Sequence, residues 1–208
     1  MLLSTAHFPP VQYFCKIIDL KQVFIEAHDS YQRQSYRNRF RVLGANGPLY
    51  LSSPLVKGRS SGQSIKEVKL DYSESWNVNH FKTIRSAYKH SPFYEYYMDD
   101  LMQFWEKERT FLFDLNMEIM ATLFELLDVS IELKETEDFM EFNEENKSDF
   151  RNIIHPKRGW HNDPNFSPQP YTQSFTVRYG FVPNLSILDL LFQKGPEAVS
   201  VIKESRNL

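Results

Sequence analysis

The chain has 208 residues, of which 41% are hydrophobic and 25% charged, and its formal net charge at pH 7 is −3. A chain of this length can bury one sizeable core and is short for two independent domains, so we expect a single domain over residues 1–208. The slightly acidic balance argues against nucleic acid as a partner, because domains that bind nucleic acid usually carry a basic excess.

The single cysteine, Cys15, excludes an internal disulfide and a cysteine-rich zinc site. His155 and His161 do not have the spacing of metal ligands, so we predict no metal site. Residues 1–14 lack the basic start of a secretory signal, and no stretch approaches the roughly 18 apolar residues of a membrane span. We therefore expect a cytoplasmic protein without a membrane span.

The first 27 residues predict a compact βαβ unit. Residues 2–8 form a short apolar stretch typical of a strand, and residues 22–27 are typical of a second strand. Between them, residues 11–20 carry apolar side chains at helical spacing, and Pro10 suits a first helical turn because an N–H there would have no partner. A strand–helix–strand unit this short implies parallel strands and a right-handed crossover.

The next segment predicts an antiparallel hairpin. Residues 36–43 alternate strictly between two faces, and residues 49–56 would return as the partner strand. The intervening pair Asn46-Gly47 is preferred in tight hairpin turns because both positions accept a positive φ.

Helices dominate the rest of the chain. Hydrophobic periodicity and capping residues predict helices over residues 79–89, 91–107, 110–126 and 184–193. Further short strands are predicted over residues 65–70, 130–133 and 171–177. The whole pattern indicates an α/β fold with a compact βαβ start, a β-hairpin insertion, a helix-rich middle and a mostly parallel sheet.

Three segments show no such periodicity. Residues 58–64 are rich in glycine and serine and predict a flexible loop, and the acidic residues that crowd between positions 135 and 149 are typical of a solvated surface. Residues 155–170 contain four prolines. A structureless stretch of this length is typical of a functional lid or of a disordered loop.

The predicted strand over residues 36–43 places Arg37, Arg39 and Arg41 on one face. Three guanidinium groups repel each other unless solvent or an anion lies against them, and guanidinium matches phosphate and carboxylate in paired hydrogen bonds. The arginines therefore predict an anionic ligand, with pairing to the acidic run or exposure to water as the alternative. If a ligand binds there, alanine at Arg37 and Arg39 should abolish binding and leave the melting temperature nearly unchanged.

The turn after the first predicted strand, residues 7–13, lies where ligands of open α/β sheets bind and where a helix N-terminus favours anions. It contains no glycine-rich fingerprint and no phosphate loop, so neither dinucleotide binding nor P-loop chemistry is indicated. His7 is a candidate acid or base near neutral pH or else a structural histidine. Gln12 is a candidate ligand contact in the same turn.

Asn116 stands within the apolar stripe of the helix predicted over residues 110–126. Its amide either ties the helix to a neighbouring backbone or faces a pocket, because an unpaired buried amide is costly. Candidates for a pocket wall, with core packing as the alternative, are Trp76, His80, Tyr88 and Tyr94. His80 is also a candidate proton carrier.

Taken in order, several motifs resemble the WbqC-like proteins of bacteria. They are HFPPVQYF (7–14), YQRQSYRNR (31–39), ANG (45–47), Trp76 with His80, SPFYEYY (91–97), DLN (114–116) and NLSILDLLF (184–192). The resemblance covers nearly the whole chain, and the version here is similar to a branch of the Bacteroidetes type. The chain departs from the family pattern at residues 28–30, where many members have an acidic-Gln stretch, and at Val11, where members tend to have Trp.

The family is named for genes of surface-polysaccharide (O-antigen) clusters, so the resemblance implies a cytoplasmic step in making or decorating a sugar-linked precursor. We expect a transferase-like enzyme that binds a phosphate-bearing donor, either a nucleotide sugar or an acyl donor. In this hypothesis Arg37 and Arg39 hold the anion, Asn38 orients a neighbouring segment, and His7 or His80 carries protons. The loop over residues 155–170 would close over the site.

Two other functions remain open at this point. One is a non-catalytic binding or scaffold module of an envelope assembly pathway, whose arginines would be paired internally with acids. The other is a nucleotide-binding α/β protein of unrelated purpose. A small-molecule ligand that carries phosphate or sugar is the expected partner, and the sequence predicts neither a cofactor nor an oligomeric state.

Overall fold

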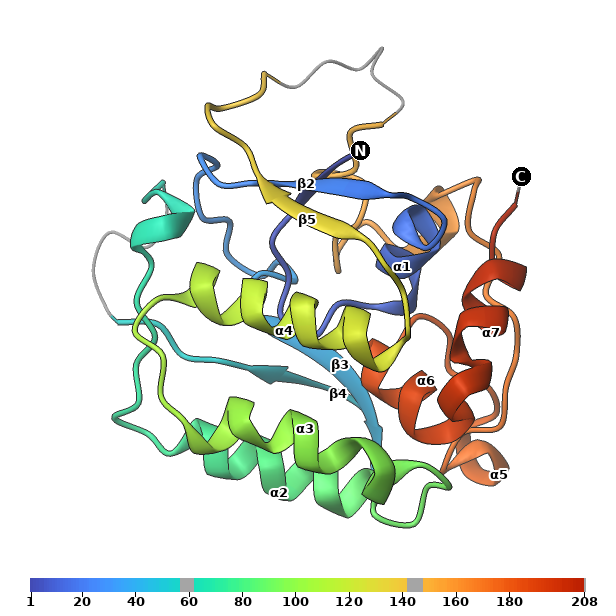
Figure 1. The fold of residues 1–208 in the computed structure, drawn as a ribbon. Helices are drawn as coiled ribbons and strands as arrows, with labels where there is room; N and C mark the ends of the chain where they lie inside the picture. Colours follow the sequence, from blue (N-terminus) through green and yellow to red (C-terminus); the bar gives the residue numbers. More distant parts are fainter. Residues whose placement is uncertain (57–61, 142–147, 208) are drawn as a thin grey trace.

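A small parallel sheet lies at one side of the computed structural model, which describes residues 1–56, 62–141 and 148–207 (Figure 1). Its strands are β1 (Leu2–Ser4), β2 (Gln22–Glu26) and β5 (Glu132–Glu135), in the order β1-β2-β5. A parallel bridge between Leu2 and Asp149 extends the sheet beyond β1. The α/β class and the parallel sheet are therefore confirmed.

The βαβ unit at the start of the chain is also confirmed. Helix α1 (Val11–Ile17) connects β1 with β2 and begins directly after Pro10, which is extended with a ψ of 160°. Strand β1 is shorter than the predicted one because the chain leaves the sheet at His7, whose backbone N–H donates to the carbonyl of Tyr36 (2.8 Å). Residues 5 and 6, which follow β1, consequently project past the carboxyl end of the sheet.

The predicted hairpin forms a separate antiparallel pair. Strands β3 (Arg39–Gly44) and β4 (Gly47–Ser52) place Gly44 opposite Gly47, so the turn consists of residues 45 and 46. The predicted turn is wrong by one residue. Gly47, with a φ of 104°, opens the return strand in a conformation that glycine adopts readily.

Two predicted strands are wrong. Residues 65–70 contain the 3-10 turn η1 (Ile65–Glu67) and isolated bridges, because Ile65 and Val68 are both buried at a spacing that also suits one helical turn. Residues 171–177 contain the short helix α5 (Thr176–Tyr179) instead of a strand. There the side-chain amide of Gln173 hydrogen-bonds to both the carbonyl and the N–H of Val182. A side chain thus takes the place that a neighbouring strand would have at Val182.

Helices make up most of the remaining structure and match the predicted ones apart from their ends. They are α2 (Trp76–Tyr88), α3 (Tyr94–Glu106), α4 (Leu112–Leu126), α6 (Ile187–Lys194) and the unpredicted α7 (Ala198–Glu204), with the 3-10 turns η2 (Trp160–Asn162) and η3 (Gly195–Glu197). Helix α2 packs on α3 and β3, and α3 packs on α4 and α6. In Figure 1 helix α4 runs below the parallel sheet, and the hairpin with α2 and α3 lies lower still.

The main core joins residues from both ends of the chain. The stripe of α4 formed by Leu115, Ile119 and Leu123 is fully buried, as its spacing predicts.

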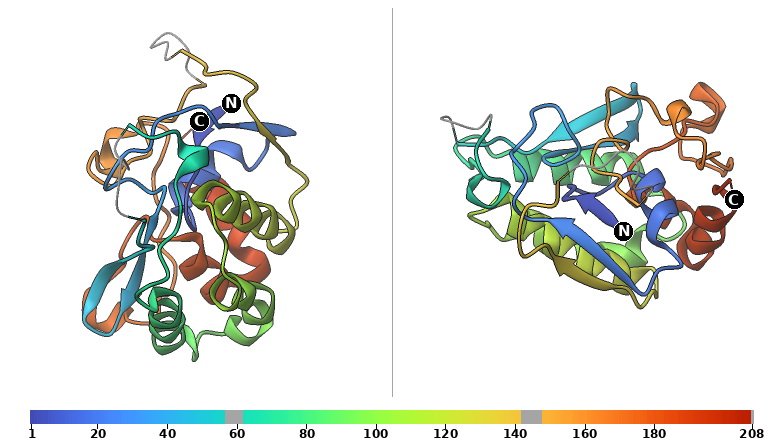
Figure 2. Two further views of the ribbon diagram at one scale, coloured as in Figure 1. Left: turned by 90° about the vertical axis from the view of Figure 1, so that its left-hand side faces the viewer. Right: turned by 90° about the horizontal axis from the view of Figure 1, so that it is seen from above.

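Helix α5 lies against the tip of the hairpin, where the side chains of Arg178 and Tyr179 both donate to the carbonyl of Ala45 (2.7 and 2.9 Å; Figure 2).

The acidic run is not wholly a solvated surface. Asp149 is buried and accepts a hydrogen bond from Arg151 (2.6 Å), which also donates to the buried Glu26 (2.8 Å). The prediction of a solvated segment is therefore wrong at Asp149, because the parallel bridge draws this residue into the sheet. Residues 142–147, and most of the predicted loop at 58–64, lie outside the described residues.

The proline-rich segment over residues 155–170 is anchored rather than free. Its Asp163 is buried and accepts hydrogen bonds from Lys16 (2.8 Å) and Gln12 (2.8 Å), both on α1. Turns and η2 account for much of its backbone. The segment is therefore attached to α1. Its first residue, His155, comes directly after Ile154, which lines the pocket at the carboxyl edge of the sheet.

Candidate functional site

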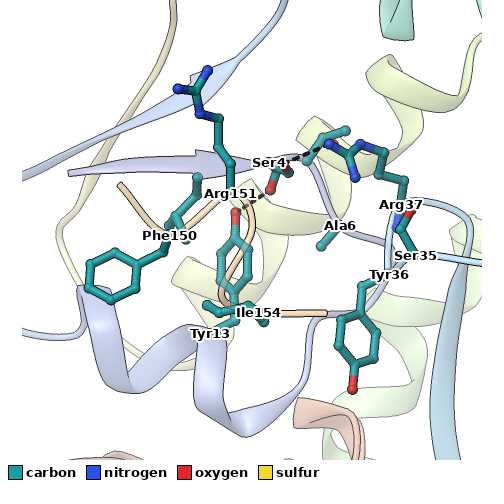
Figure 3. A pocket seen from close by; sticks show the side chains of 11 residues that line it. Ser4, Ala6, Tyr13, Ser35, Tyr36, Arg37, Phe150, Arg151 and Ile154 are labelled. Atoms are coloured by element: carbon teal, nitrogen blue, oxygen red, sulfur yellow. Dashed lines mark hydrogen bonds between the residues drawn. The ribbon is translucent and has the colours of Figure 1, made fainter. Parts of the chain in front are cut away.

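A narrow pocket lies at the carboxyl end of β1, where ligands of parallel sheets generally bind (Figure 3). Its walls are residues 3–6, residues 35–37, and the side chains of Phe150, Arg151 and Ile154, and Tyr13 completes the lining. About 280 Å³ lies between these atoms, but only about one water molecule fits inside. The pocket as it stands therefore admits one small polar group.

Arg37 supplies the pocket with a buried positive charge. Its side chain is 3% exposed, and Nη2 donates to Ser4 Oγ (2.9 Å) and to the carboxylate of Asp29. Burial lowers the pKa of Arg37 and the Asp29 carboxylate acts in the opposite direction. The guanidinium nevertheless stays charged at any physiological pH.

Two residues that line the pocket each carry a buried side-chain polar atom with no hydrogen-bond partner among the described residues. These atoms are Nε of Arg37 and Oγ1 of Thr5. A buried polar group without a partner costs roughly 1–3 kcal/mol, so such atoms are usually satisfied by water or by a ligand. An oxygen placed between these walls would accept from Arg37 Nε and could pair with the Thr5 hydroxyl.

The rim of the pocket is rich in positive charge. His155 follows the pocket residue Ile154, and its pKa is lowered first by burial and then by the charges of Arg37, Arg158, Arg39 and Lys157. Each of these cations therefore lies near enough to His155 to act on it. The rim formed by residues 33–39 and 155–158 is called the cationic rim below, and its field favours anions.

The predicted stripe of three arginines on one strand face is wrong. Strand β3 begins only at Arg39, and Arg37 lies in the turn before it, where its side chain is buried. Just before the strand, Asn38 is held to Ser53 by both its backbone and its side chain: its carbonyl accepts from the Ser53 N–H (2.8 Å) and its side-chain amide donates to the Ser53 carbonyl (2.9 Å). Arg39 instead donates to the carbonyl of Gln34 and stacks over a tyrosine ring.

A buried polar chain supports the wall that carries Arg37. His7 Nδ1 contacts Asn116 Oδ1 (3.1 Å), and His7 Nε2 contacts Ser53 Oγ (3.1 Å). Because the Asn116 amide donates to the carbonyl of Arg37 (2.8 Å), its oxygen must accept, which assigns the proton of the neutral ring to Nδ1. Ser53 then donates to Nε2.

This serine–histidine–amide chain has the polarity of a catalytic triad assembled from distant segments. His7 and Ser53 are nevertheless fully buried, and neither lines the pocket. Burial, and secondarily the charge of His80, lowers the pKa of His7 to about 3. The ring is therefore neutral near pH 7 and holds the backbone of residues 36–37 in place.

A sequence model described as the WbqC-like protein family matches residues 5–159 of the chain, which is more than half of it. The chain belongs to the WbqC-like protein family. The match includes the cationic rim and the pocket residues apart from Leu3 and Ser4. No curated protein and no solved structure matches the chain. Assignment to a Bacteroidetes-type branch stays a prediction.

The remaining predicted residues of this WbqC-like protein fall into separate places. Asn38 lies beside the polar chain and accepts from the hydroxyl of Tyr31 (2.9 Å). Trp76 and His80 form an aromatic contact (5.0 Å between centroids) in the core behind His7. Burial lowers the pKa of His80 to about 4, and neither residue lines the pocket.

Three predicted contacts lie away from the pocket of the WbqC-like protein. Gln12 is buried between Asp163 and Asn184 and joins α1 to later segments of the chain. Tyr88 and Tyr94 both pack on Phe192 of α6, at 5.3 and 5.2 Å between ring centroids. Gln12 therefore serves buried hydrogen bonds within the protein, and Tyr88 and Tyr94 serve the packing of the core.

The sequence analysis missed most of the pocket's polar atoms. Ser4 ends β1 and Thr5 follows it, which is the position where parallel sheets present ligand contacts, but the strand predicted over residues 2–8 extended past both residues. Asp29 and Arg151 gave no local signal. Their roles arise only when the carboxyl ends of β2 and of residues 148–150 meet in space.

A wider groove lies elsewhere, between α3, the end of α4 and η3. It is lined by Tyr96 and Tyr97 and by three acids, Asp100, Glu125 and Asp128. Its negative charge disfavours an anionic ligand. Within the described ranges no cluster of metal-ligating residues occurs, and no helix there is both long and apolar enough to cross a membrane.

Proposed function

We propose that this WbqC-like protein binds a phosphate-bearing small molecule with one anionic group at the pocket beside Arg37. We propose further that it acts as a transferase-like enzyme on that donor, a nucleotide sugar or an acyl donor, in a cytoplasmic step of surface-polysaccharide biosynthesis. The observation that supports the binding step is the pair of unpartnered polar atoms, Arg37 Nε and Thr5 Oγ1, on two residues that line the same pocket.

Physical chemistry favours an anion over a neutral group there. A buried guanidinium interacts strongly with an oxyanion because little water screens the pair. The hydroxyl of Thr5 adds a donor that needs no counter-charge. Because the pocket admits only a small group, the rest of the ligand would lie outside, over the cationic rim.

The transferase step itself rests on the role that the family resemblance implies and not on an assembled set of catalytic residues. His7 and His80, the candidate proton carriers, are buried behind the pocket with pKa values lowered to about 3 and about 4. We assign His7 to the support of the pocket wall. A proton carrier would have to come from the ligand or from the rim, where His155 is partly exposed.

A non-catalytic binding module is the second candidate, and one observation favours it. The guanidinium of Arg37 already has an internal counter-ion, Asp29, as expected for a structural arginine. The two functions differ in a simple way. An enzyme consumes its donor in the presence of an acceptor, whereas a module binds it unchanged.

A thermal-shift screen with inorganic phosphate, nucleotide sugars and coenzyme A derivatives tests the binding step. A ligand at a hundred times its dissociation constant should stabilise the protein by about 2.7 kcal/mol. Thr5→Val should weaken this shift, and Arg41→Ala, on strand β3 and outside the pocket, should preserve it. No shift with any phosphate compound would contradict the proposal.

Alanine at Arg37 is a poorer test than the sequence suggested. Its side chain is buried and paired, so its removal would leave Asp29 without its partner and would lower the melting temperature as well. The expectation of an unchanged melting temperature applied to an exposed arginine. Thr5→Val keeps the shape of the side chain and removes only the hydroxyl.

A further inference from the structure

The ion pair between Arg37 and Asp29 is unequal in its burial. The side chain of Arg37 is 3% exposed, whereas that of Asp29 is 16% exposed. The backbone around Asp29 is fixed, because its carbonyl accepts from Ile65 (2.9 Å) and the next residue forms a bridge to Ser64. The carboxylate can therefore turn toward solvent while the chain that carries it and the guanidinium stay in place.

The guanidinium is only half used on one of its edges. Nε and Nη2 point their hydrogens in the same direction, which is the geometry that binds two oxygens of one phosphate or carboxylate. Nη2 donates to Asp29 and to Ser4 Oγ, and Nε has no partner among the described residues. The Asp29 carboxylate bonds Nη2 through one oxygen and leaves Nε without a partner, whereas an anion with one oxygen at each nitrogen would satisfy both atoms.

The second arginine of the pocket is not available in this way. Arg151 donates to Asp149 (2.6 Å) and to Glu26 (2.8 Å), and its guanidinium points away from Ser4 (Figure 3). Its charge is thus already balanced by two buried carboxylates. An entering anion therefore has one guanidinium to bind, and Asp29 competes for it.

We propose that Asp29 is an exchangeable counter-ion, which holds Arg37 in the free protein and gives way to an oxyanion of the ligand. The inference rests on the proposed function and concerns the same site. Exchange frees the edge of Arg37 and the space beside it. It also favours a phosphate dianion over a carboxylate, because a carboxylate only replaces the charge that leaves.

Calorimetric titration with inorganic phosphate and with acetate, at pH 7.5 and fixed ionic strength, tests this exchange. Asp29→Asn removes the competing charge and should tighten phosphate binding by about tenfold or more. Acetate should bind the unmodified protein more weakly than phosphate does, and in Asp29→Asn its affinity should rise by at least the same factor. Glu118→Gln, which removes the acid of an exposed pair with Arg109, should leave both affinities unchanged.

The possible outcomes distinguish the proposed exchange of Asp29 from the existence of the anion-binding site. Phosphate binding that is unchanged or weaker in Asp29→Asn would overturn the exchange and leave the anion site standing. Absence of phosphate binding in both proteins would overturn both. Binding in Asp29→Asn alone would support the exchange in its strongest form.

A measurement on the unmodified protein covers the case in which Asp29→Asn does not fold. Carbon-13 NMR of the Asp29 carboxyl group should show a shift toward the value of a solvated carboxylate as phosphate is added. The Arg37 Nε–H resonance should move as it gains an acceptor. Phosphate binding without a change at Asp29 would overturn the proposal.

Discussion

Thr5 contributes a hydroxyl that does nothing for the folded protein on its own. It is buried, and its oxygen has no partner among the described residues. Thr5→Val should therefore leave the free energy of unfolding unchanged or raise it by about 1 kcal/mol, and should weaken the binding of a phosphate ligand by about 10- to 100-fold. Denaturant unfolding and ligand titration measure the two effects.

Thr136 provides the matched control for that change. Its hydroxyl donates to Glu26 (2.8 Å) and accepts from the N–H of Ala27 (3.1 Å), so it is fully used. Thr136→Val should lower the free energy of unfolding by about 1–3 kcal/mol. A similar loss for Thr5→Val would show that Thr5 has a structural partner after all.

Asp189 is a buried acid whose charge destabilises the fold. Burial raises its pKa to about 6, although hydrogen bonds from Tyr171, Tyr88 and Gln173 oppose this. The unfolded chain loses this proton near pH 4, so the stability contributed by the protonated acid is lost as the pH rises from about 4 to 6. Asp189→Asn should remove this loss and add about 1–3 kcal/mol at pH 7.

The test is the free energy of unfolding at several pH values for both proteins. The difference between Asp189→Asn and the unmodified protein should grow between pH 4 and pH 6 and stay constant above. A difference that does not vary with pH would mean that Asp189 titrates normally.

Helix α1 and the segment over residues 155–170 are joined by a buried ion pair. Lys16 and Asp163 are both nearly inaccessible, with their charged atoms 2.7 Å apart. Asp163→Asn would leave the Lys16 charge buried without its partner, which should cost about 3–5 kcal/mol of unfolding free energy. The exposed pair of Lys203 with Asp19 is the control, and Asp19→Asn should cost at most about 1 kcal/mol.

Urea denaturation of both variants measures these costs. Equal losses would indicate that the 155–170 segment detaches easily from α1. The segment then would be free to close over the site, as the lid hypothesis requires. A large loss for Asp163→Asn alone supports an anchored segment whose first residues are fixed at the cationic rim.

Element by element, the sequence predicts what depends on local pattern. The βαβ start and four of the helices follow from apolar spacing and prolines, as does the buried stripe of α4. Residues 65–70 and 171–177 were misread because short alternating runs do not show whether a neighbouring strand exists. In the structure, side chains such as Gln173 and bridges to single residues replace the missing ladders.

The position of the candidate site could be predicted from the sequence, but only some of the residues that form it could be. The carboxyl end of the first strand and Arg37 follow from the βαβ pattern and from the arginine-rich motif. Asp29, Arg151 and the chain from Ser53 through His7 to Asn116 depend on contacts across many residues. No spacing in the sequence encodes such contacts.

Across the whole molecule, buried neutral histidines should make the fold sensitive to acid. The pKa of His7 is lowered to about 3 and that of His80 to about 4, in both cases mainly by burial. The unfolded chain takes up these protons near pH 6.5, so stability is lost as the pH falls from 6.5 toward 4 and below.

His80→Phe should reduce the slope of unfolding free energy against pH between 6.5 and 4. Its effect at pH 7 should be moderate, because the ring packs among aromatic side chains and gives up one hydrogen bond to the carbonyl of Ser52 (3.2 Å). Chemical denaturation across this pH range measures the slope. An unchanged slope would mean that His80 accepts a proton in the folded state.

The central claim is that an anion of the ligand binds at Arg37, at the carboxyl end of the parallel sheet. The most direct measurement is a crystal structure with the phosphate compound that gives the largest thermal shift. We predict a phosphate oxygen within hydrogen-bonding distance of Arg37 Nε and Thr5 Oγ1, with the rest of the ligand over the cationic rim. Density for the ligand in the groove between α3, α4 and η3, with the pocket unchanged, would contradict it.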